Sequence, residues 1–163
     1  MELVFDLDKW GYSEFYQFIK SSSEADYRLA SNLLAKVIVS WSFEGDPKNP
    51  ETIGGLTITS FRQVCGVITK EGMEMLKNSA ENKTEGFEVD VDGWTTFQNQ
   101  DYIEATQTGD AEVISKLLPL IVVKWPYSYK IDSSAVINFS FETFCEVTGA
   151  VNREFAANFS EGN

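Results

Sequence analysis

Four stretches of the chain carry apolar residues at the spacing of an amphipathic helix. They are 30–41, 61–75, 114–125 and 141–155. Asp26 and Asp110 stand shortly before the first and third stretches, where an aspartate commonly caps a helix. Pro119 lies within the third stretch and is expected to kink its helix or to make it start or end nearby. The pattern predicts a mainly α protein.

Shorter elements are expected before these helices. Residues 4–8 and 89–92 alternate apolar and acidic side chains, which is typical of a short strand, with a helical turn as the alternative. Two such strands could pair with each other. Ser13 is a candidate N-cap for a short helix. Its inward-facing residues would be Phe15, Phe18 and Ile19, and those of its counterpart Phe97, Tyr102 and Ile103. One short strand per unit would make the fold α+β.

The two halves of the chain are similar in sequence. Segment 5–43 aligns with 89–127 at 10 identical positions out of 39, without a gap. Further along, a slightly smaller shift matches Phe61 with Phe141 and Cys65 with Cys145. Such self-similarity indicates a tandem duplication, with two pseudo-symmetric helical lobes that share a core.

This repeat divides the chain into four parts. The parts are repeat unit 1 (1–76), a polar linker (77–87), repeat unit 2 (88–156) and a C-terminal tail (157–163). The linker contains few apolar residues, so we expect a loop there. Thr57 or Thr59 and Asn138 or Ser140 are the candidate N-caps of the last helix in each unit.

Charge narrows the choice of partners. The 163 residues include 13 Lys and Arg against 25 Asp and Glu, a net charge of −12. This balance disfavours binding to nucleic acid or to an anionic membrane surface, because both need clustered basic residues. The N-terminus shows no signal peptide and no apolar run has transmembrane length, so a cytoplasmic location is expected.

The residues that commonly carry catalysis are scarce. The chain has no histidine, which removes the usual acid–base group at neutral pH. Segment 88–93 resembles the start of a calcium loop, but the twelfth position is Asn99 where a bidentate carboxylate is required. Cys65 and Cys145 are expected to be buried and inert. We therefore expect no enzyme activity, no cofactor and no metal site.

The hydrophobic pattern also resembles one protein family. The opening segment 5–10, the Ala/Leu-rich stretch ending at Trp41, the acidic Pro-containing loop 44–51 and the Leu56-Thr57 entry into a further helix are similar to small tail-assembly proteins of tailed bacteriophages. The resemblance implies a small helical chaperone that coats an aggregation-prone helical partner such as the tape-measure protein. The duplication within one chain and Pro119 depart from that pattern.

Two functions remain open at this point, both with a protein as the expected partner. A chaperone-like binding protein would use apolar surface, with Trp41 and Trp125 as anchors if these rings are accessible. An acidic inhibitor or nucleic-acid mimic would instead use carboxylates of the second lobe. These carboxylates are Asp90, Asp92, Asp101, Glu104, Asp110 and Glu112. Nothing in the sequence fixes the oligomeric state.

Overall fold

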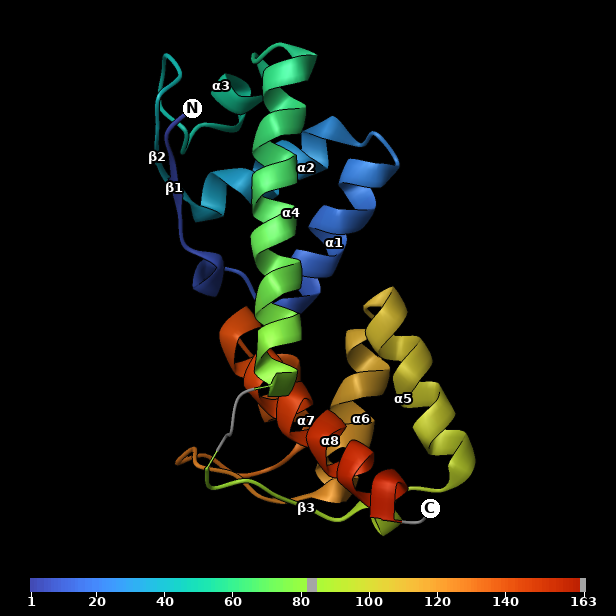
Figure 1. The fold of residues 1–163 in the computed structure, drawn as a ribbon. Helices are drawn as coiled ribbons and strands as arrows, with labels where there is room; N and C mark the ends of the chain where they lie inside the picture. Colours follow the sequence, from blue (N-terminus) through green and yellow to red (C-terminus); the bar gives the residue numbers. More distant parts are fainter. Residues whose placement is uncertain (82–84, 162–163) are drawn as a thin grey trace.

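The computed structural model describes residues 1–81 and 85–161, and most of them are helical (Figure 1). Lobe 1 (1–81) contains β1 (Leu3–Phe5), the 3-10 turn η1 (Leu7–Lys9), α1 (Tyr12–Ser23), α2 (Tyr27–Val37), β2 (Ile38–Trp41), α3 (Pro50–Gly54) and α4 (Ile58–Glu81). Lobe 2 (85–161) repeats this order with β3 (Glu88–Val89), η2 (Val91–Gly93), α5 (Thr96–Thr108), α6 (Ala111–Ile121), β4 (Val122–Lys124), α7 (Ser133–Ile137) and α8 (Phe141–Glu161). The protein is mainly α, with two lobes of the same architecture.

Helices of the two lobes are capped by side chains at equivalent positions of the repeat. Asp26 Oδ1 accepts from the Leu29 amide and Asp110 Oδ1 from the Val113 amide, both at 3.2 Å. Thr57 caps α4 and Ser140 caps α8 in the same way, each through an amide three residues on. The prediction for α1 is wrong by two residues, because the helix begins at Tyr12 with Gly11 as its N-cap.

The second helix of each lobe ends earlier than its apolar stripe. Both α2 and α6 stop at equivalent residues, Val37 and Ile121, and the chain continues as a strand. The cause is a run of β-branched residues after each helix, which favours extended backbone. Pro119 lies in the last turn of α6, and α2 ends at the equivalent residue without a proline, so Pro119 does not decide where the helix ends.

Each short opening strand pairs inside its own lobe. β1 is antiparallel to β2, with Leu3 opposite Trp41, and β3 is antiparallel to β4, with Glu88 opposite Lys124. The prediction that β1 and β3 pair with each other is therefore wrong. The strand that follows the second helix lies within the same lobe and supplies the partner edge.

The structure also corrects the alignment between the last two helices of lobe 1 and the last two helices of lobe 2. α3 and α7 are related by the same shift along the chain as α4 and α8, judged by where each helix begins. This shift matches Phe61 with Phe144 and Gly66 with Gly149. Cys65 and Cys145 are thus not equivalent, and matching them in the sequence placed the register three residues away.

Two expected irregular segments are partly helical. Residues 77–81 of the expected linker continue α4, and residues 157–161 of the expected tail continue α8. The rest of the linker includes 82–84, and the tail ends in 162–163; these positions lie outside the described residues.

The two lobes share one hydrophobic core. Buried residues of both halves form a single cluster, and the C-terminal end of α4 packs against α8 (Figure 1). The two helices approach closely where Gly149 faces Ser79, since a Cβ on Gly149 would lie 2.3 Å from the Ser79 carbonyl oxygen. Arg153 Nη1 donates to the same oxygen at 2.8 Å.

An indole contact repeated in both halves anchors each lobe. Trp10 Nε1 donates to the Leu33 carbonyl at 2.8 Å, and Trp94 Nε1 donates to the Leu117 carbonyl at 2.7 Å. Both indoles join the 3-10 turn to the second helix of their lobe and are buried. These equivalent bonds follow from the equivalent positions of the two tryptophans in the repeat.

Each indole has one equivalent aromatic neighbour, Phe18 in lobe 1 and Tyr102 in lobe 2, and a second one that comes from different helices in the two lobes. In lobe 1 it is Phe15 of α1, whose ring lies where a Cβ on Gly72 of α4 would be, 2.3 Å away. In lobe 2 the equivalent of Phe15 is Asn99, and Phe155 of α8, at the position of Gly72, stacks on Trp94. The large aromatic residue thus stands on α1 in lobe 1 and on α8, the counterpart of α4, in lobe 2.

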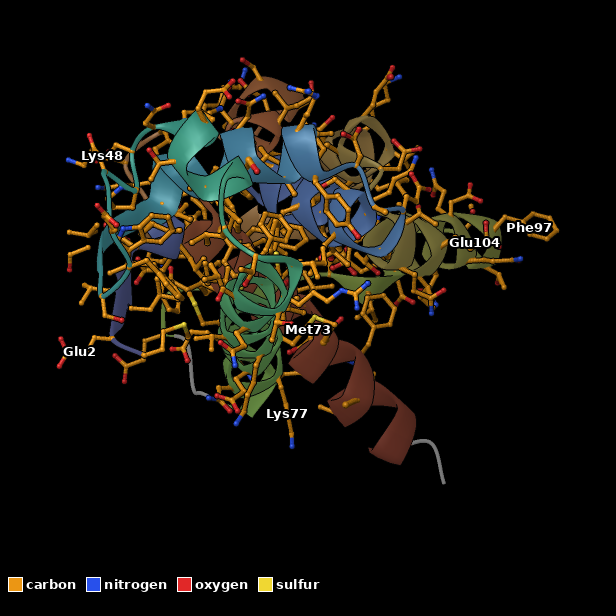
Figure 2. The ribbon with its side chains drawn as sticks, turned by 90° about the horizontal axis from the view of Figure 1, so that it is seen from above. Glu2, Lys48, Met73, Lys77, Phe97 and Glu104 are labelled. Carbon is orange, nitrogen blue, oxygen red and sulfur yellow. The ribbon has the colours of Figure 1, made fainter. Side chains whose placement is uncertain are left out.

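This exchange leaves α5 with little buried surface. Tyr102 and Ala105 are its buried residues, so the expected inward position of Tyr102 is confirmed. Phe97 is 77% exposed and Ile103 47% exposed, so their expected inward positions are wrong. Phe97 projects from the edge of the molecule, on the same side as Glu104 (Figure 2).

Candidate functional site

The two tryptophans predicted as anchors differ in accessibility. Trp41 is partly exposed and contacts Phe43, whereas Trp125 is 6% exposed. Each indole N–H donates to a carbonyl four residues on, in Gly45 and Tyr129 respectively. The condition for anchoring, an accessible ring, is met in part by Trp41 and not by Trp125.

The predicted carboxylates of lobe 2 do not form one surface. Asp90 caps η2 beside the C-terminal end of α6, where its amide donates to the Ile121 carbonyl at 2.8 Å. Asp110 caps the other end of α6, about 16 Å away along a helix of this length. Glu112 pairs with Lys116 at 2.9 Å, and Asp92 is exposed. Asp90 and Asp110 thus have structural roles as caps.

The remaining two predicted carboxylates lie on α5. Asp101 and Glu104 are exposed, and Glu104 accepts a hydrogen bond from Gln100 at 3.2 Å. Both lie on a helix that packs mainly against α6.

A different group of side chains gathers where the two lobes meet. We call it the junction patch, and it combines four carboxylates with two tyrosines. It consists of Asp6, Asp8, Tyr127, Tyr129, Glu142 and Glu146. The two aspartates belong to lobe 1, and the other four residues belong to lobe 2.

Backbone bonds between the lobes bring these residues together. The Tyr12 amide donates to the Phe139 carbonyl at 3.3 Å, and the Phe141 amide donates to the Trp10 carbonyl at 3.0 Å. This bridge connects the segment after η1 with the start of α8. As a result, η1 packs against α8, and its aspartates face the first turns of that helix.

The carboxylates of the junction patch repel one another. Partial burial and the negative charges of Asp8, Glu146 and Asp6 raise the pKa of Glu142 above its ordinary value. Within the described residues, the ion pairs are Lys36–Glu14 and Lys116–Glu112, so none of the four carboxylates is paired with a cation. The patch therefore holds a local excess of negative charge at neutral pH.

The tyrosines form the aromatic side of the patch. Tyr127 and Tyr129 are stacked with ring centroids 5.6 Å apart, and both contact Trp125. Tyr127 donates its hydroxyl hydrogen to Glu146 Oε2, and burial together with this carboxylate raises the pKa of Tyr127. Tyr129 is 45% exposed.

Sequence reasoning missed the lobe 2 residues of this patch. Glu142 and Glu146 are four residues apart, so they share one helix face, and a like-charge pair at that spacing is unfavourable. At the equivalent positions, lobe 1 carries Thr59 and Gln63. Charges present in one copy of a duplication and absent from the other were the available signal.

Candidate metal ligands do not cluster in the described residues. No cluster of three or more Cys, Asp or Glu side chains there could hold a metal ion. Cys65 and Cys145 are free and buried, as the sequence predicts, and burial raises their thiol pKa values to about 11 and about 12. Protonated thiols of this kind are poor nucleophiles at neutral pH.

Comparison with known proteins does not identify a relative of this chain. Protein-family models, curated proteins and solved structures yield no match to the chain. In the part of the chain that the structure describes, no helix combines the length and the apolar character needed to cross a lipid bilayer.

Proposed function

We propose that the protein is a non-enzymatic binding protein whose junction patch takes a short Lys/Arg-rich segment of a protein partner. The observation that carries the proposal is a set of four carboxylates that form no ion pair among the described residues and lie beside the exposed Tyr129. A cation placed there would relieve their mutual repulsion, and it would gain a cation–π contact with Tyr129.

Apolar capture has less support as the mode of binding. Of the two expected anchors, Trp125 is buried and Trp41 is partly exposed. In a tail-assembly chaperone, which the sequence resembles, the basic segment would belong to the helical assembly partner. In an acidic inhibitor it would belong to the protein that is blocked.

A binding experiment with two matched variants tests the proposal. The probe is an eight-residue peptide of alternating arginine and alanine with blocked ends, titrated by calorimetry. Glu142→Gln with Glu146→Gln removes two charges from the junction patch, while the Tyr127 hydroxyl keeps an amide oxygen as acceptor. Asp101→Asn with Glu104→Gln removes two charges from α5 and is the control.

The first double variant is expected to bind the peptide at least tenfold more weakly than the wild type, and the control less than threefold. Because exposed charges are screened by salt, wild-type affinity is also expected to fall steeply as the Debye length shrinks from about 10 Å to about 3 Å. Equal weakening in both variants, or no binding to the wild type, would contradict the proposal.

The aromatic contribution can be measured separately. Tyr129→Ala removes the exposed ring and leaves all four carboxylates. A cation–π contact at an exposed site contributes about 0.5–1 kcal/mol, so a two- to fivefold loss of peptide affinity is expected. Unchanged affinity would mean that the carboxylates act without the ring.

A further inference from the structure

A surface cavity of about 700 Å³ lies between the first turns of α2 and the short helix α3. Its lining combines one cation, Arg28, with the carboxylates of Asp26 and Glu51, and with the polar side chains of Ser31 and Asn32. This cavity belongs to lobe 1 and is separate from the junction patch. The duplicated lobe provides a reference for each of its features.

A buried hydroxyl in the cavity wall has no hydrogen-bond partner among the described residues. Ser31 is 3% exposed, and its Oγ is unpaired. The equivalent Ser115 is equally buried but donates to the Glu112 carbonyl at 2.7 Å. Since buried hydroxyls are nearly always hydrogen-bonded, the unpaired Oγ of Ser31 is an exception that lobe 2 does not share.

In the part of the chain that the structure describes, the positions at the mouth of the cavity carry no ion pair in lobe 1, whereas the equivalent positions of lobe 2 do. Glu112 and Lys116 form an ion pair at 2.9 Å on α6. The equivalent positions on α2 carry Arg28 and Asn32, so Arg28 has no acidic partner one turn further along α2. Neither Arg28 nor Glu51 forms an ion pair within the described residues.

Gly54 keeps the cavity open. A Cβ built on Gly54 would meet one atom within 4 Å, Ser31 Oγ at 3.8 Å. The space that a side chain at this position of α3 would enter is therefore empty. The equivalent residue of α7 is Ile137. Space, an unpaired hydroxyl and an unpaired cation therefore coincide at one place in lobe 1, and lobe 2 differs at each of the equivalent positions.

We propose that this cavity binds a small zwitterion of the α-amino acid class. The Arg28 guanidinium pairs with the carboxylate of the ligand, and the carboxylates of Glu51 and Asp26 pair with its ammonium group. Ser31 Oγ and the Asn32 amide supply hydrogen bonds beside the carboxylate. The opposite charges in the lining match the two charges of the ligand.

The test uses the twenty standard amino acids as probes, each titrated against the full chain by ligand-observed NMR and calorimetry. At least one is expected to bind with a Kd below about 1 mM. The methyl ester of that amino acid, which lacks the carboxylate charge, is expected to bind at least tenfold more weakly. If none of the twenty binds, or if the ester binds equally well, the proposal is wrong.

Two variants transfer features of lobe 2 into the cavity. Gly54→Ile fills it, and Arg28→Glu with Asn32→Lys installs the closed ion pair of α6 at exposed positions. Each is expected to weaken binding at least tenfold while circular dichroism stays unchanged. The reciprocal control, Glu112→Arg with Lys116→Asn, is expected to bind as the wild type does.

The ion-pair variant keeps the test decisive if Gly54→Ile does not fold. Wild-type affinity in the folded ion-pair variant would overturn the proposed role of Arg28. Equal losses in that variant and in the lobe 2 control would do the same, since they would place the ligand elsewhere.

Discussion

Gly66 and Gly149 occupy equivalent positions in α4 and α8, yet a methyl group would meet different surroundings at each. Nothing lies within 4 Å of a Cβ on Gly66, whereas a Cβ on Gly149 would lie 2.3 Å from the Ser79 carbonyl oxygen. Gly66→Ala is expected to stabilise the protein by up to about 1 kcal/mol through helix propensity. Gly149→Ala is expected to destabilise it by about 1–3 kcal/mol, because the backbone of α4 must move.

Urea unfolding monitored by circular dichroism measures both changes in the free energy of unfolding. The pair of variants controls for the substitution itself, since each places alanine at the same position of the repeat. Equal effects of the two substitutions would contradict the close approach of α4 and α8.

Removing one charge from the junction patch is expected to stabilise the free protein. Glu142 is four residues from Glu146 and faces Asp6 and Asp8. Like-charge pairs at this spacing destabilise a helix by about 0.2–0.5 kcal/mol, so Glu142→Gln is expected to gain at least that amount at pH 7. Glu74→Gln, next to Lys70 and Lys77 on the face of α4, is the control and is expected to gain nothing.

The gain from Glu142→Gln is expected to depend on pH. A carboxyl pKa raised in the folded state means that the folded protein binds this proton more tightly than the unfolded chain does. Repulsion therefore destabilises the wild type fully above the folded-state pKa and disappears below the ordinary value of about 4.3. The difference in thermal stability between variant and wild type should shrink from pH 7 to pH 4; a difference that grows on acidification would contradict the crowding of the carboxylates.

At the scale of elements, α1 and α5 are equivalent helices with different support. α1 buries Tyr12, Phe15, Phe18 and Ser21, and it contacts helices of both lobes, whereas α5 packs mainly against α6. Local opening costs less free energy where fewer side chains are buried. Backbone amides in the middle of α5 are therefore expected to exchange with deuterium faster than those of α1, and equal protection would contradict the packing described for α5.

The sequence predicted elements better than it predicted their ends and registers. Aspartate caps and apolar stripes located the helices α2 and α6, because these signals are local. The stripes also included Trp41 and Trp125, which lie in or beyond strands, since helical spacing and a short β-branched run overlap. Matching Cys65 with Cys145 was misleading. Thr57 and Ser140, the caps that the structure selects from the candidate pairs, are separated by the correct shift.

The junction patch could not be predicted from the sequence, because its residues come from both lobes. Asp6 and Asp8 lie near the start of the chain, whereas Tyr127 belongs to its last third. Their proximity depends on the backbone bridge between Gly11 and Ser140 and on the packing of η1 against α8. Periodicity carries no information about such contacts, although the missing counterparts of Glu142 and Glu146 in lobe 1 were visible.

At the scale of the whole molecule, each lobe depends on the other for its core. The centroid of the Phe15 ring lies 4.2 Å from that of Phe141, and Tyr12 stacks on Phe144 at 4.4 Å. Phe141→Ala is expected to cost about 3–5 kcal/mol. Calorimetry and tryptophan fluorescence should show one unfolding transition for both lobes, in the wild type and in this variant. Two separate transitions would contradict a shared core.

The central claim is that the junction patch, and not acidity in general, binds a basic segment. The most direct measurement is a titration of ¹⁵N-labelled protein with the arginine–alanine peptide, followed through amide chemical shifts at low and high salt. We expect the largest shifts on residues 6–8, 127–129 and 142–146. Residues 101–104 should stay near their starting values, and high salt should abolish the shifts. Shifts of equal size on α5 and on the patch, or shifts that persist in high salt, would contradict it.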